Sequence, residues 1–490
     1  MQSAHTAAEH FDVLIVGAGI SGIGAAYRFG RQPFRSFVVL EAEDSFGGTW
    51  LTNTFPGIRS DSDLFTFGYD FKPWRGPPIA TAAEIQRYIG EVIQENGLDR
   101  HIRYRHRISG ASWDSEANLW TVHATDGEGR AVVFTAGFLF MCQGYFRHRE
   151  GFAPTWPGMD QFKGRIVHAQ SWPSDIDVTD KNVLVVGSGA TAATIVPRVA
   201  ETARHATMLQ RSPTYFFCSA NANELADRLR ALRVDEAWIH EIVRRDILAQ
   251  EADFTRRCFE EPELVRTELI AGVAAIVGED TAAKHFTPRY RPWQQRVAFL
   301  PNGDMLQAIR SGSASVETDE IERFAADGVR LKSGGEIAAD IVVLATGFNM
   351  NLFGDIAFSV DGEPLDWART VTYRGMMFTG VPNLAWVFGY FRSSWTLRSD
   401  LVAAFVMRVL DHMERTGVRR VEVAVPGQLS EQPLLAWIAE ENFNPGYLKR
   451  ALPFLPRRLD HPAWQHSQDY FSDLSSFPAI DLAGAEFRYG

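Results

Sequence analysis

The chain has 490 residues, of which 46% are hydrophobic and 22% charged, and its formal net charge is −11. This length allows two or three domains with cores of their own, and the composition is typical of a globular protein. A negative chain without a compensating basic stripe is not expected to bind nucleic acid. Cys142, Cys218 and Cys258 form no close pair. No metal site or dithiol redox centre is therefore predicted, and a cytoplasmic, reducing compartment is expected.

The first residues, MQSAHTAAEH, have neither a basic region nor an apolar core, so no signal peptide is expected. No apolar run is long enough to cross a membrane, and residues 13–26 are better interpreted as a strand, a turn and a helix. Association with a membrane surface stays possible, and the oligomeric state stays open.

Two segments resemble each other, FDVLIVGAGISGIGAAYRF at 11–29 and KNVLVVGSGATAATIVPRV at 181–199. Each has a β-branched apolar run, a glycine-rich turn and then a stretch of small residues with helical character. This is the beginning of a βαβ nucleotide-binding unit. The sequence therefore predicts an α/β fold with two Rossmann-like dinucleotide-binding domains.

The first unit contains Gly17, Gly19 and Gly22 in the pattern G-x-G-x-x-G, which lets a pyrophosphate approach the backbone at the start of a helix. Glu41 ends the next apolar run, FVVLE, 24 residues after Gly17. A carboxylate there can accept hydrogen bonds from ribose hydroxyls and would repel a 2′-phosphate. The ligand predicted for this unit is FAD or NAD(H), and not NADPH.

The second unit contains Gly187, Gly189 and Ala192, and Arg211 follows 24 residues after Gly187. An arginine at this position can pair with a 2′-phosphate and favours NADP. The simplest interpretation is that FAD binds to the first unit and NADPH binds to the second unit. This arrangement implies hydride transfer from NADPH to the flavin. The phrase ATGFN, which contains Gly347, is typical of a chain returning toward a flavin domain.

Between the second unit and residue 287 the strand pattern fades, and charged residues alternate with apolar ones at helical spacing. We expect a helical insertion there, within the NADP domain. The predicted domains are FAD-binding at 1–150 and 350–490, NADP-binding at 151–220 and 287–349, and the insertion at 221–286.

The segment GGTWLTNTFPGIRSD, residues 47–61, and the segment FKGRIVHAQSWP, residues 162–173, carry two long patterns. The first pattern, [A/G]-G-x-W-x4-[F/Y]-P-[G/M]-x3-D, is matched by Gly47, Gly48, Trp50, Phe55, Pro56, Gly57 and Asp61. The second, F-x-G-x3-H-x3-W-[P/D], is matched by Phe162, Gly164, His168, Trp172 and Pro173. By these residues the chain resembles the type I Baeyer–Villiger monooxygenases, a family of class B flavoprotein monooxygenases.

Phrases such as MLQRSPTY, ATGFNMNLFG and NPGYLKR are most similar to a mycobacterial branch of that family, and this likeness weakens after about residue 455. The resemblance implies an enzyme that uses FAD, NADPH and O2 to convert ketones into esters or lactones through a flavin C4a-peroxide. It also implies sulfoxidation of thioethers.

The resemblance places the catalytic arginine after the helical insertion, and in PRYRPWQQR it corresponds best to Arg296, with Arg289 and Arg291 as rivals. Asp61, at the end of the first pattern, would hold this arginine and so support the negative charge of the reaction. The family has a lysine for the 2′-phosphate where this chain has Gln295. NADP preference would then depend more on Arg211, aided by Arg291.

The second pattern lies, by resemblance, on a hinge between the two nucleotide domains. His168 there is more often structural than a general base, Trp172 would anchor the hinge by packing, and Gly164 would allow a bend. Trp50 is expected beside the flavin, and Trp395 is expected either near the flavin or in the core. The predicted cofactor-binding residues are Gly17, Gly19, Gly22, Glu41, Gly48, Thr49, Trp50, Asp61, Gly187, Gly189, Ala192, Arg211, Ser212 and Gly347.

Three alternatives stay open at this point. The same cofactors would serve an enzyme whose main task is S- or N-oxygenation. An NADPH-to-flavin reductase that passes electrons to a protein acceptor is a second alternative. A non-catalytic NADP-sensing module is a third, although Asp61 and the arginines would have no purpose in it.

Overall fold

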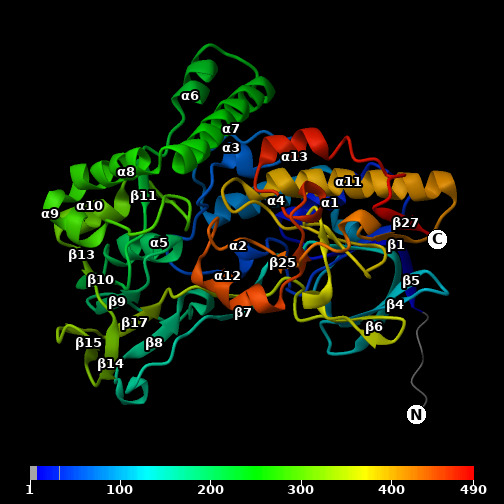
Figure 1. The fold of residues 1–490 in the computed structure, drawn as a ribbon. Coiled ribbons are helices and arrows are strands. Elements are labelled where there is room, and N and C mark those ends of the chain that lie inside the picture. The colour runs from blue at the N-terminus through cyan, green and yellow to red at the C-terminus, as the bar shows by residue number, and fades with distance from the viewer. Residues whose placement is uncertain (1–7, 33) are drawn as a thin grey trace.

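The computed structural model describes residues 8–32 and 34–490, and it forms two lobes that lie side by side (Figure 1). One lobe contains the first glycine-rich turn and the end of the chain, and the other contains the second turn. Residues 1–7 of the segment considered above for a signal peptide lie outside the described residues.

The first lobe is built on a mixed sheet that begins with the apolar run at the start of the chain. Val13, Leu14 and Ile15 are fully buried in β1 because parallel neighbours flank it on both sides, which a continuous β-branched run favours. In spatial order its strands are β20 (Glu363–Pro364), β19 (Ala357–Val360), β4 (Arg107–Asp114), β5 (Leu119–Thr125), β6 (Ala131–Met141), β1 (Glu9–Val16), β2 (Phe37–Leu40) and β3 (Ile102–Arg103), and β23 (Leu384–Trp386) also pairs with β6.

The second lobe is built on a parallel sheet whose central strands are equally apolar. In spatial order its strands are β13 (Ala314–Thr318), β10 (His205–Gln210), β9 (Asn182–Val186), β17 (Ile341–Leu344) and β8 (Arg165–His168). β9 pairs in parallel with both β10 and β17, as in a Rossmann unit. The fold predicted from the two glycine-rich segments is confirmed.

The helices that follow the two glycine-rich turns begin at equivalent residues. α1 (Ile20–Gly30) begins after Gly19, and α5 (Ala190–Val199) begins after Gly189. Neither helix has a side-chain cap at its N-terminus. Their first backbone N–H groups are therefore available to an anionic ligand.

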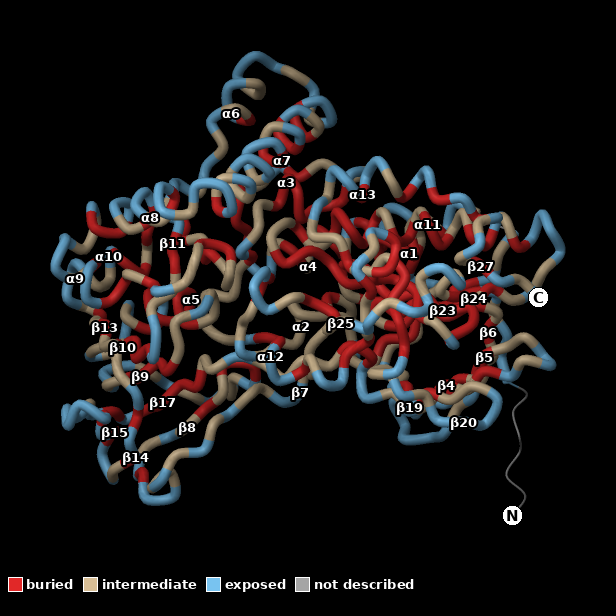
Figure 2. The backbone as a smooth tube through the Cα atoms, viewed as in Figure 1, coloured by how far each residue is buried: buried red, intermediate tan, exposed pale blue. Residues whose placement is uncertain are grey.

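The residues predicted as a helical insertion fold into α6 (Glu224–Ala231), α7 (Glu236–Glu260), α8 (Pro262–Val277) and α9 (Glu279–His285). α6 and the start of α7 project above the two lobes, and their outer faces are exposed (Figures 1 and 2). Ile239 and Val243 of α7 belong to the core of the first lobe, whereas Val273 and Ala274 of α8 belong to the core of the second. The insertion therefore connects the two lobes.

The chain returns to the first lobe after β17. Residues 395–416 form α11 (Trp395–Thr416), which begins after Ser394 and packs against α1. Of the apolar segment NLAWVFGY, only Leu384–Trp386 forms a strand. β24 (Val421–Val423) pairs with β27 (Phe487–Tyr489), so the end of the chain is held against the same lobe.

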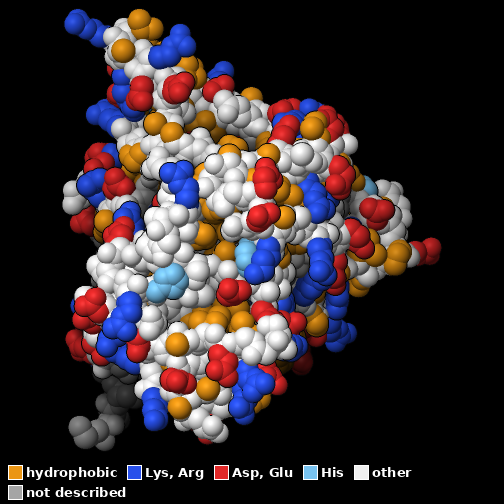
Figure 3. All heavy atoms as spheres, turned by 90° about the vertical axis from the view of Figure 1, so that its left-hand side faces the viewer, with side chains coloured by type: hydrophobic (Ala, Val, Ile, Leu, Met, Phe, Trp, Pro, Cys, Tyr) orange, Lys and Arg blue, Asp and Glu red, His pale blue; other side chains and the backbone are white. Residues whose placement is uncertain are grey.

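Two further observations concern the surface. On the face shown in Figure 3, which belongs to the second lobe and the projecting helices, positive and negative side chains are interspersed. Within residues 8–32 and 34–490, no helix is long and apolar enough to cross a membrane.

Candidate active site

A cavity of about 1320 Å³ extends from the first glycine-rich turn to the second. Gly17 and Gly19 line it at one end, and Gly187 and Gly189 line it at the other. The structure thus brings the two predicted dinucleotide sites together around one shared space.

The first turn is shaped by close contacts between backbone segments. A Cβ atom on Gly22 would lie 1.8 Å from the carbonyl oxygen of Gly17, so only glycine lets α1 pack on this turn. A Cβ atom on Gly48, whose φ is +55°, would lie 3.2 Å from the Cα of Gly19. Gly19 and Gly48 therefore form a bare backbone surface at the N-terminus of α1.

Glu41 is buried at the end of β2 and lines the same cavity. Its Oε2 accepts a hydrogen bond from Ala18 N at 2.6 Å, and its Oε1 accepts one from Glu43 N at 2.9 Å. Burial raises the pKa of this carboxyl, although the backbone hydrogen bonds act in the opposite direction. Each oxygen keeps a free lone pair, which is what two ribose hydroxyls require.

Thr49 and Trp50 begin the short helix α2 (Thr49–Thr52) directly after Gly48, and both line the cavity. The Trp50 ring packs edge-on against Phe67, with 5.7 Å between ring centroids. Trp50 is therefore held in the wall of the cavity, and its place beside the flavin stays a prediction.

The second turn is arranged in the same way. A Cβ atom on Gly187 would lie 2.3 Å from the carbonyl oxygen of Ala345, and Ala192 is fully buried where α5 packs on the sheet. In contrast, a Cβ atom on Gly189 would meet no described atom within 4 Å. The backbone at Gly189 therefore faces open space in the cavity.

Arg211 and Ser212 follow β10 directly, and both are exposed and line the cavity. Within residues 8–32 and 34–490, the Arg211 guanidinium has no hydrogen-bond or ion-pair partner, so its charge is available to a ligand. Gly347, with φ of +100°, lines the cavity where the chain leaves β17 toward the first lobe.

Asp61 and Arg296 meet in the cavity wall. The Nε of Arg296 lies 2.7 Å from the Oδ2 of Asp61, and the side chains are 35% and 40% exposed for Arg296 and Asp61, respectively. Both residues line the cavity, so this exposed surface is turned toward its interior. Arg296 Nη1 also donates a hydrogen bond to the carbonyl oxygen of Phe391 at 3.3 Å.

The guanidinium of Arg296 stays charged in this position. Burial acts to lower its pKa, but Asp61, Tyr145 and Tyr447 together raise the pKa above its ordinary value. The wall of the cavity therefore holds a permanent positive charge that its neighbours orient.

The rival arginines lie elsewhere. Arg291 stacks on the Phe259 ring at 3.9 Å and donates to the carbonyl oxygens of Cys258 and Pro292, so the expectation that it aids NADP binding is not supported by its position. Arg289 is exposed and, like Arg291, does not line the cavity. Gln295 does line it, next to Arg296.

An aromatic group surrounds the Arg296 end of the cavity, and the sequence did not predict most of it. Tyr145 stacks on Trp395 with 5.0 Å between ring centroids, and Tyr447 stacks on Phe348 at 4.2 Å. Trp395 Nε1 donates to Ser21 Oγ at 2.8 Å, so of its two expected locations this ring takes the cavity wall. Burial raises the pKa of Tyr145 to about 12, so its hydroxyl stays protonated.

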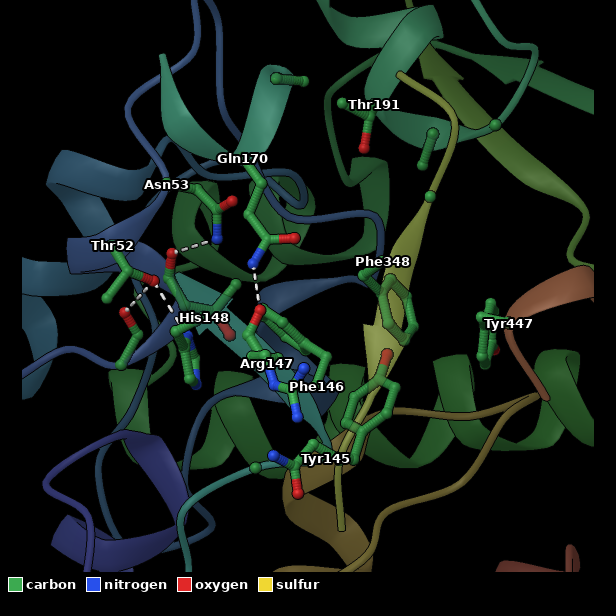
Figure 4. Close-up of a pocket in the computed structure, with 18 of the residues that line it drawn as sticks. Thr52, Asn53, Tyr145, Phe146, Arg147, His148, Gln170, Thr191, Phe348 and Tyr447 are labelled. Carbon is green, nitrogen blue, oxygen red and sulfur yellow. Dashed lines mark hydrogen bonds between the residues drawn. The ribbon is translucent and has the colours of Figure 1, made fainter. Parts of the chain in front are cut away.

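Polar side chains line the opposite wall, as Figure 4 shows. Thr52 Oγ1 and His148 Nδ1 are 3.1 Å apart, and the Gln170 side chain donates to the carbonyl oxygen of Arg147. Burial lowers the pKa of His148, so its ring is neutral at ordinary pH. This wall offers hydrogen bonds, and the Arg147 guanidinium that also lines it is paired with Glu150 and Asp355.

The second sequence pattern lies along β8 and the turn after it. Phe162 is buried in the second lobe, and a Cβ atom on Gly164 would lie 2.2 Å from the carbonyl oxygen of Asp340. His168 lines the cavity, and its Nδ1 accepts from Gln170 N at 3.1 Å. Burial lowers the pKa of His168, which leaves little basic character for a general base.

Trp172 and Pro173 follow this turn. Trp172 packs against the core of the second lobe, and its carbonyl oxygen accepts from Thr54 Oγ1 of the first lobe at 3.4 Å. The pattern thus contacts both lobes, and its role as a hinge stays a prediction.

The arrangement fits the two predicted cofactors. At the first end, a bare helix N-terminus and a buried carboxylate suit a pyrophosphate and a ribose with free hydroxyls, as in FAD. At the second end, an equivalent helix N-terminus lies beside the unpaired Arg211, which suits a dinucleotide with a 2′-phosphate. The donor sets therefore differ in the direction that the sequence predicted.

Comparison with known proteins gives the class of protein that the two sequence patterns indicated. The family model described as flavin-binding monooxygenase-like matches residues 66–226, and a model for an NAD(P)-binding Rossmann-like domain matches residues 15–74. The chain is 42% identical over 472 residues to the FAD-containing monooxygenase EthA of Mycobacterium tuberculosis, covering 95% of each chain. It is 39% identical over 469 residues to the probable FAD-binding monooxygenase AlmA of Acinetobacter baylyi, covering 95% of this chain and 93% of AlmA.

The fold is similar to that of a steroid monooxygenase solved with bound NADP, with a TM-score of 0.78, 22% identity and coverage of 98% of this chain and 99% of the other. The identity to the curated relatives establishes the family: the chain belongs to the FAD-containing monooxygenases. The resemblance drawn from the two sequence patterns is therefore confirmed for the class of flavin monooxygenase. FAD as a cofactor is confirmed as well.

Proposed function

We propose that this flavin monooxygenase uses NADPH and O2 to insert one oxygen atom into ketones, giving esters or lactones. In balanced form, ketone, O2, NADPH and a proton give ester, NADP⁺ and water. The ion pair between Arg296 and Asp61, in the wall of a cavity that both dinucleotide sites share, is the observation that carries this proposal.

The cofactors would be held by the groups already described. Gly19, Gly48 and Glu41 would bind the pyrophosphate and ribose of FAD, and Gly189 and Arg211 would bind NADPH. Bound FAD supplies the chemistry of O2 activation, with electrons taken from NADPH. The neighbour solved with NADP supports the second assignment.

Arg296 would act on the substrate. A ketone carbonyl under attack develops negative charge on its oxygen, and a fixed guanidinium beside it stabilises that charge where bulk water is excluded. Asp61 keeps the guanidinium in one orientation, so little reorganisation is needed during the reaction.

The aromatic rings at this end suit an apolar substrate. Tyr145, Trp395, Phe348 and Tyr447 present flat surfaces that exclude water, while the tyrosine hydroxyls can donate hydrogen bonds. A ketone or a thioether of moderate size has the required polarity.

The test is product analysis. Purified protein is incubated with NADPH, O2 and paired panels of ketones and thioethers, and the products are identified by gas chromatography. Esters or lactones support the proposal, and hydrogen peroxide as the only product across the panels contradicts it. Sulfoxides or N-oxides without esters would instead assign S- or N-oxygenation as the main task, and electron transfer to a protein acceptor without oxygenation would indicate a reductase.

This proposal includes the predicted domain boundaries. They are 1–150 and 350–490 for the FAD-binding domain, 151–220 and 287–349 for the NADP-binding domain, and 221–286 for the helical insertion. The proposal also includes the cytoplasmic location, which the three unpaired cysteines support.

A further inference from the structure

Glu251 lies on α7, in the part of the insertion that contacts the first lobe. Its Oε2 accepts a hydrogen bond from Ser393 Oγ at 3.0 Å, and its side chain is partly buried. Glu251 itself does not line the cavity, whereas Ser393 does. The hydrogen bond therefore joins the insertion to the cavity wall.

The segment that contains Ser393 also holds Arg296. The carbonyl oxygen of Phe391, two residues before Ser393, accepts the hydrogen bond from Arg296 Nη1. On the other side, Ser394 Oγ is 2.7 Å from Thr66 Oγ1 of α3 (Leu64–Phe67). Residues 391–394 are thus fixed between α7, α3 and the guanidinium.

α7 also contacts α3 at a residue that precedes Glu251 along the helix. Arg244 Nη1 donates to the carbonyl oxygens of Phe65, Thr66 and Gly68, at distances between 2.8 and 3.2 Å. Because Arg244 is buried, this contact fixes the position from which Glu251 reaches Ser393.

The charged groups that act on Glu251 are Asp63, Arg244 and Arg296. The pKa of the Glu251 carboxyl is raised to about 7, because the raising effects of burial and of Asp63 outweigh the lowering effects of Ser393 and the two arginines. The carboxyl therefore changes its charge in the neutral range, close to a guanidinium of the candidate active site.

We propose that Glu251 is a positioning residue for Arg296, acting through Ser393 and the Phe391 carbonyl. This inference rests on the proposed function of Arg296. With Glu251 ionised, the hydrogen bond from Ser393 is charge-assisted, and the attraction between Glu251 and Arg296 holds segment 391–394 in place. With Glu251 protonated, both effects weaken, and the guanidinium is held less firmly.

The first experiment measures stability and is independent of activity. The pKa of Glu251 is raised in the folded protein, so ionisation of Glu251 destabilises the fold as pH rises from its ordinary value of 4.5 to about 7. The midpoint of thermal unfolding, followed by circular dichroism on the FAD-loaded protein, is compared between wild type and Glu251→Gln. The advantage of Glu251→Gln over wild type is expected to grow with pH across this window and to stay constant above it.

The same comparison in an Arg296→Ala background tests the coupling. Since Arg296 lowers the pKa of Glu251, its removal should move the end of the window to higher pH. Glu241→Gln is the matched control, because Glu241 lies on the same helix with an exposed side chain and pairs with Arg245. The difference in unfolding midpoint between Glu241→Gln and wild type is expected to show no change with pH between 4.5 and about 7.

The second experiment measures the ratio of oxygenated product to NADPH consumed. In wild type this ratio should rise between about pH 6 and pH 8, and in Glu251→Gln it should stay at the low-pH value, roughly two- to fivefold below wild type at the upper end. Ser393→Ala, which removes the hydrogen bond through which Glu251 acts, should flatten the wild-type rise, and it also serves if Glu251→Gln does not fold.

The outcomes separate the two proposals. The role of Glu251 is overturned if the stability difference between Glu251→Gln and wild type does not change with pH. It is also overturned if the pH range of that change is the same in the Arg296→Ala background. An unchanged pH profile of the product ratio also overturns it. If wild type gives no oxygenated product at all, the proposed function fails, while the stability experiment still decides whether Glu251 and Arg296 are coupled.

Discussion

Arg296 and Asp61 come from distant parts of the chain, yet the Nε of one lies 2.7 Å from the Oδ2 of the other. Asp61 ends the segment that follows the first dinucleotide unit, and Arg296 precedes β12 (Ala298–Pro301), after the helical insertion. The pair therefore joins the two lobes at the cavity. A guanidinium fixed in this way can act on negative charge that develops in the cavity.

Replacing Arg296 tests this role directly. Arg296→Ala removes the positive charge that is proposed to stabilise the substrate oxygen, so the rate of product formation should fall by about 10²–10³-fold. The reduction of FAD by NADPH, followed anaerobically by absorbance, should stay measurable. Arg289→Ala is the control, because Arg289 is exposed and lies outside the cavity wall. Product formation that survives in Arg296→Ala would assign the role to another group.

The fold and the two ends of the cavity could be predicted because they depend on local rules. A β-branched run, a glycine-rich turn and a terminal Glu41 or Arg211 lie within a short stretch of sequence, and their spacing indicates which ligand each unit is expected to bind. Choosing Arg296 over Arg291 depended on resemblance. The structure separates the two by tertiary contacts, since Arg291 stacks on Phe259 whereas Arg296 reaches Asp61.

Arg211 should determine the preference for NADPH over NADH. Arg211→Ala removes a charge-assisted contact worth about 1.5–3 kcal/mol, so the KM for NADPH should rise roughly tenfold to a hundredfold. The KM for NADH, which has no 2′-phosphate, should change little. Arg204→Ala is a suitable control, because Arg204 is an exposed arginine just before β10. An equal loss with both nucleotides would show that Arg211 does not contact the 2′-phosphate.

Apart from Trp395, which is expected either near the flavin or in the core, the aromatic end of the cavity and Glu251 could not be predicted from the sequence. Tyr145 follows the end of β6, Tyr447 lies in α12 (Gly446–Ala451), and Trp395 begins α11, so only the tertiary fold brings them together. None belongs to a spaced pattern, and tyrosine or tryptophan in an apolar stretch is as common in a core as in a pocket. Glu251 reads as one more charge on an amphipathic helix until α7 is placed against residues 391–394.

Glu41 should be required for retention of FAD. Glu41→Ala removes the hydrogen bonds that the carboxylate offers to ribose hydroxyls and leaves Ala18 N without its acceptor. We expect FAD affinity to fall roughly tenfold to a hundredfold, measured as the ratio of flavin to protein after dialysis. Glu43→Ala, which removes a partly exposed carboxylate near the same turn, should keep its FAD. Full flavin content in Glu41→Ala would contradict the assignment of the first site.

Gln295 offers a gain-of-function test of the second site. It lines the cavity beside Arg296, and the family resemblance has a lysine there for the 2′-phosphate. Gln295→Lys adds a positive charge near the proposed NADPH site, where one ion pair of this kind contributes about 0.2–1 kcal/mol when partly exposed to solvent. The KM for NADPH should therefore fall by roughly two- to fivefold, while that for NADH stays the same, as measured by initial rates with both nucleotides.

Gln294→Lys places the same charge one residue away, at a position outside the cavity wall, and should leave both values unchanged. If Gln295→Lys lowers neither KM, residue 295 lies out of reach of the 2′-phosphate, and Arg211 alone must account for the preference.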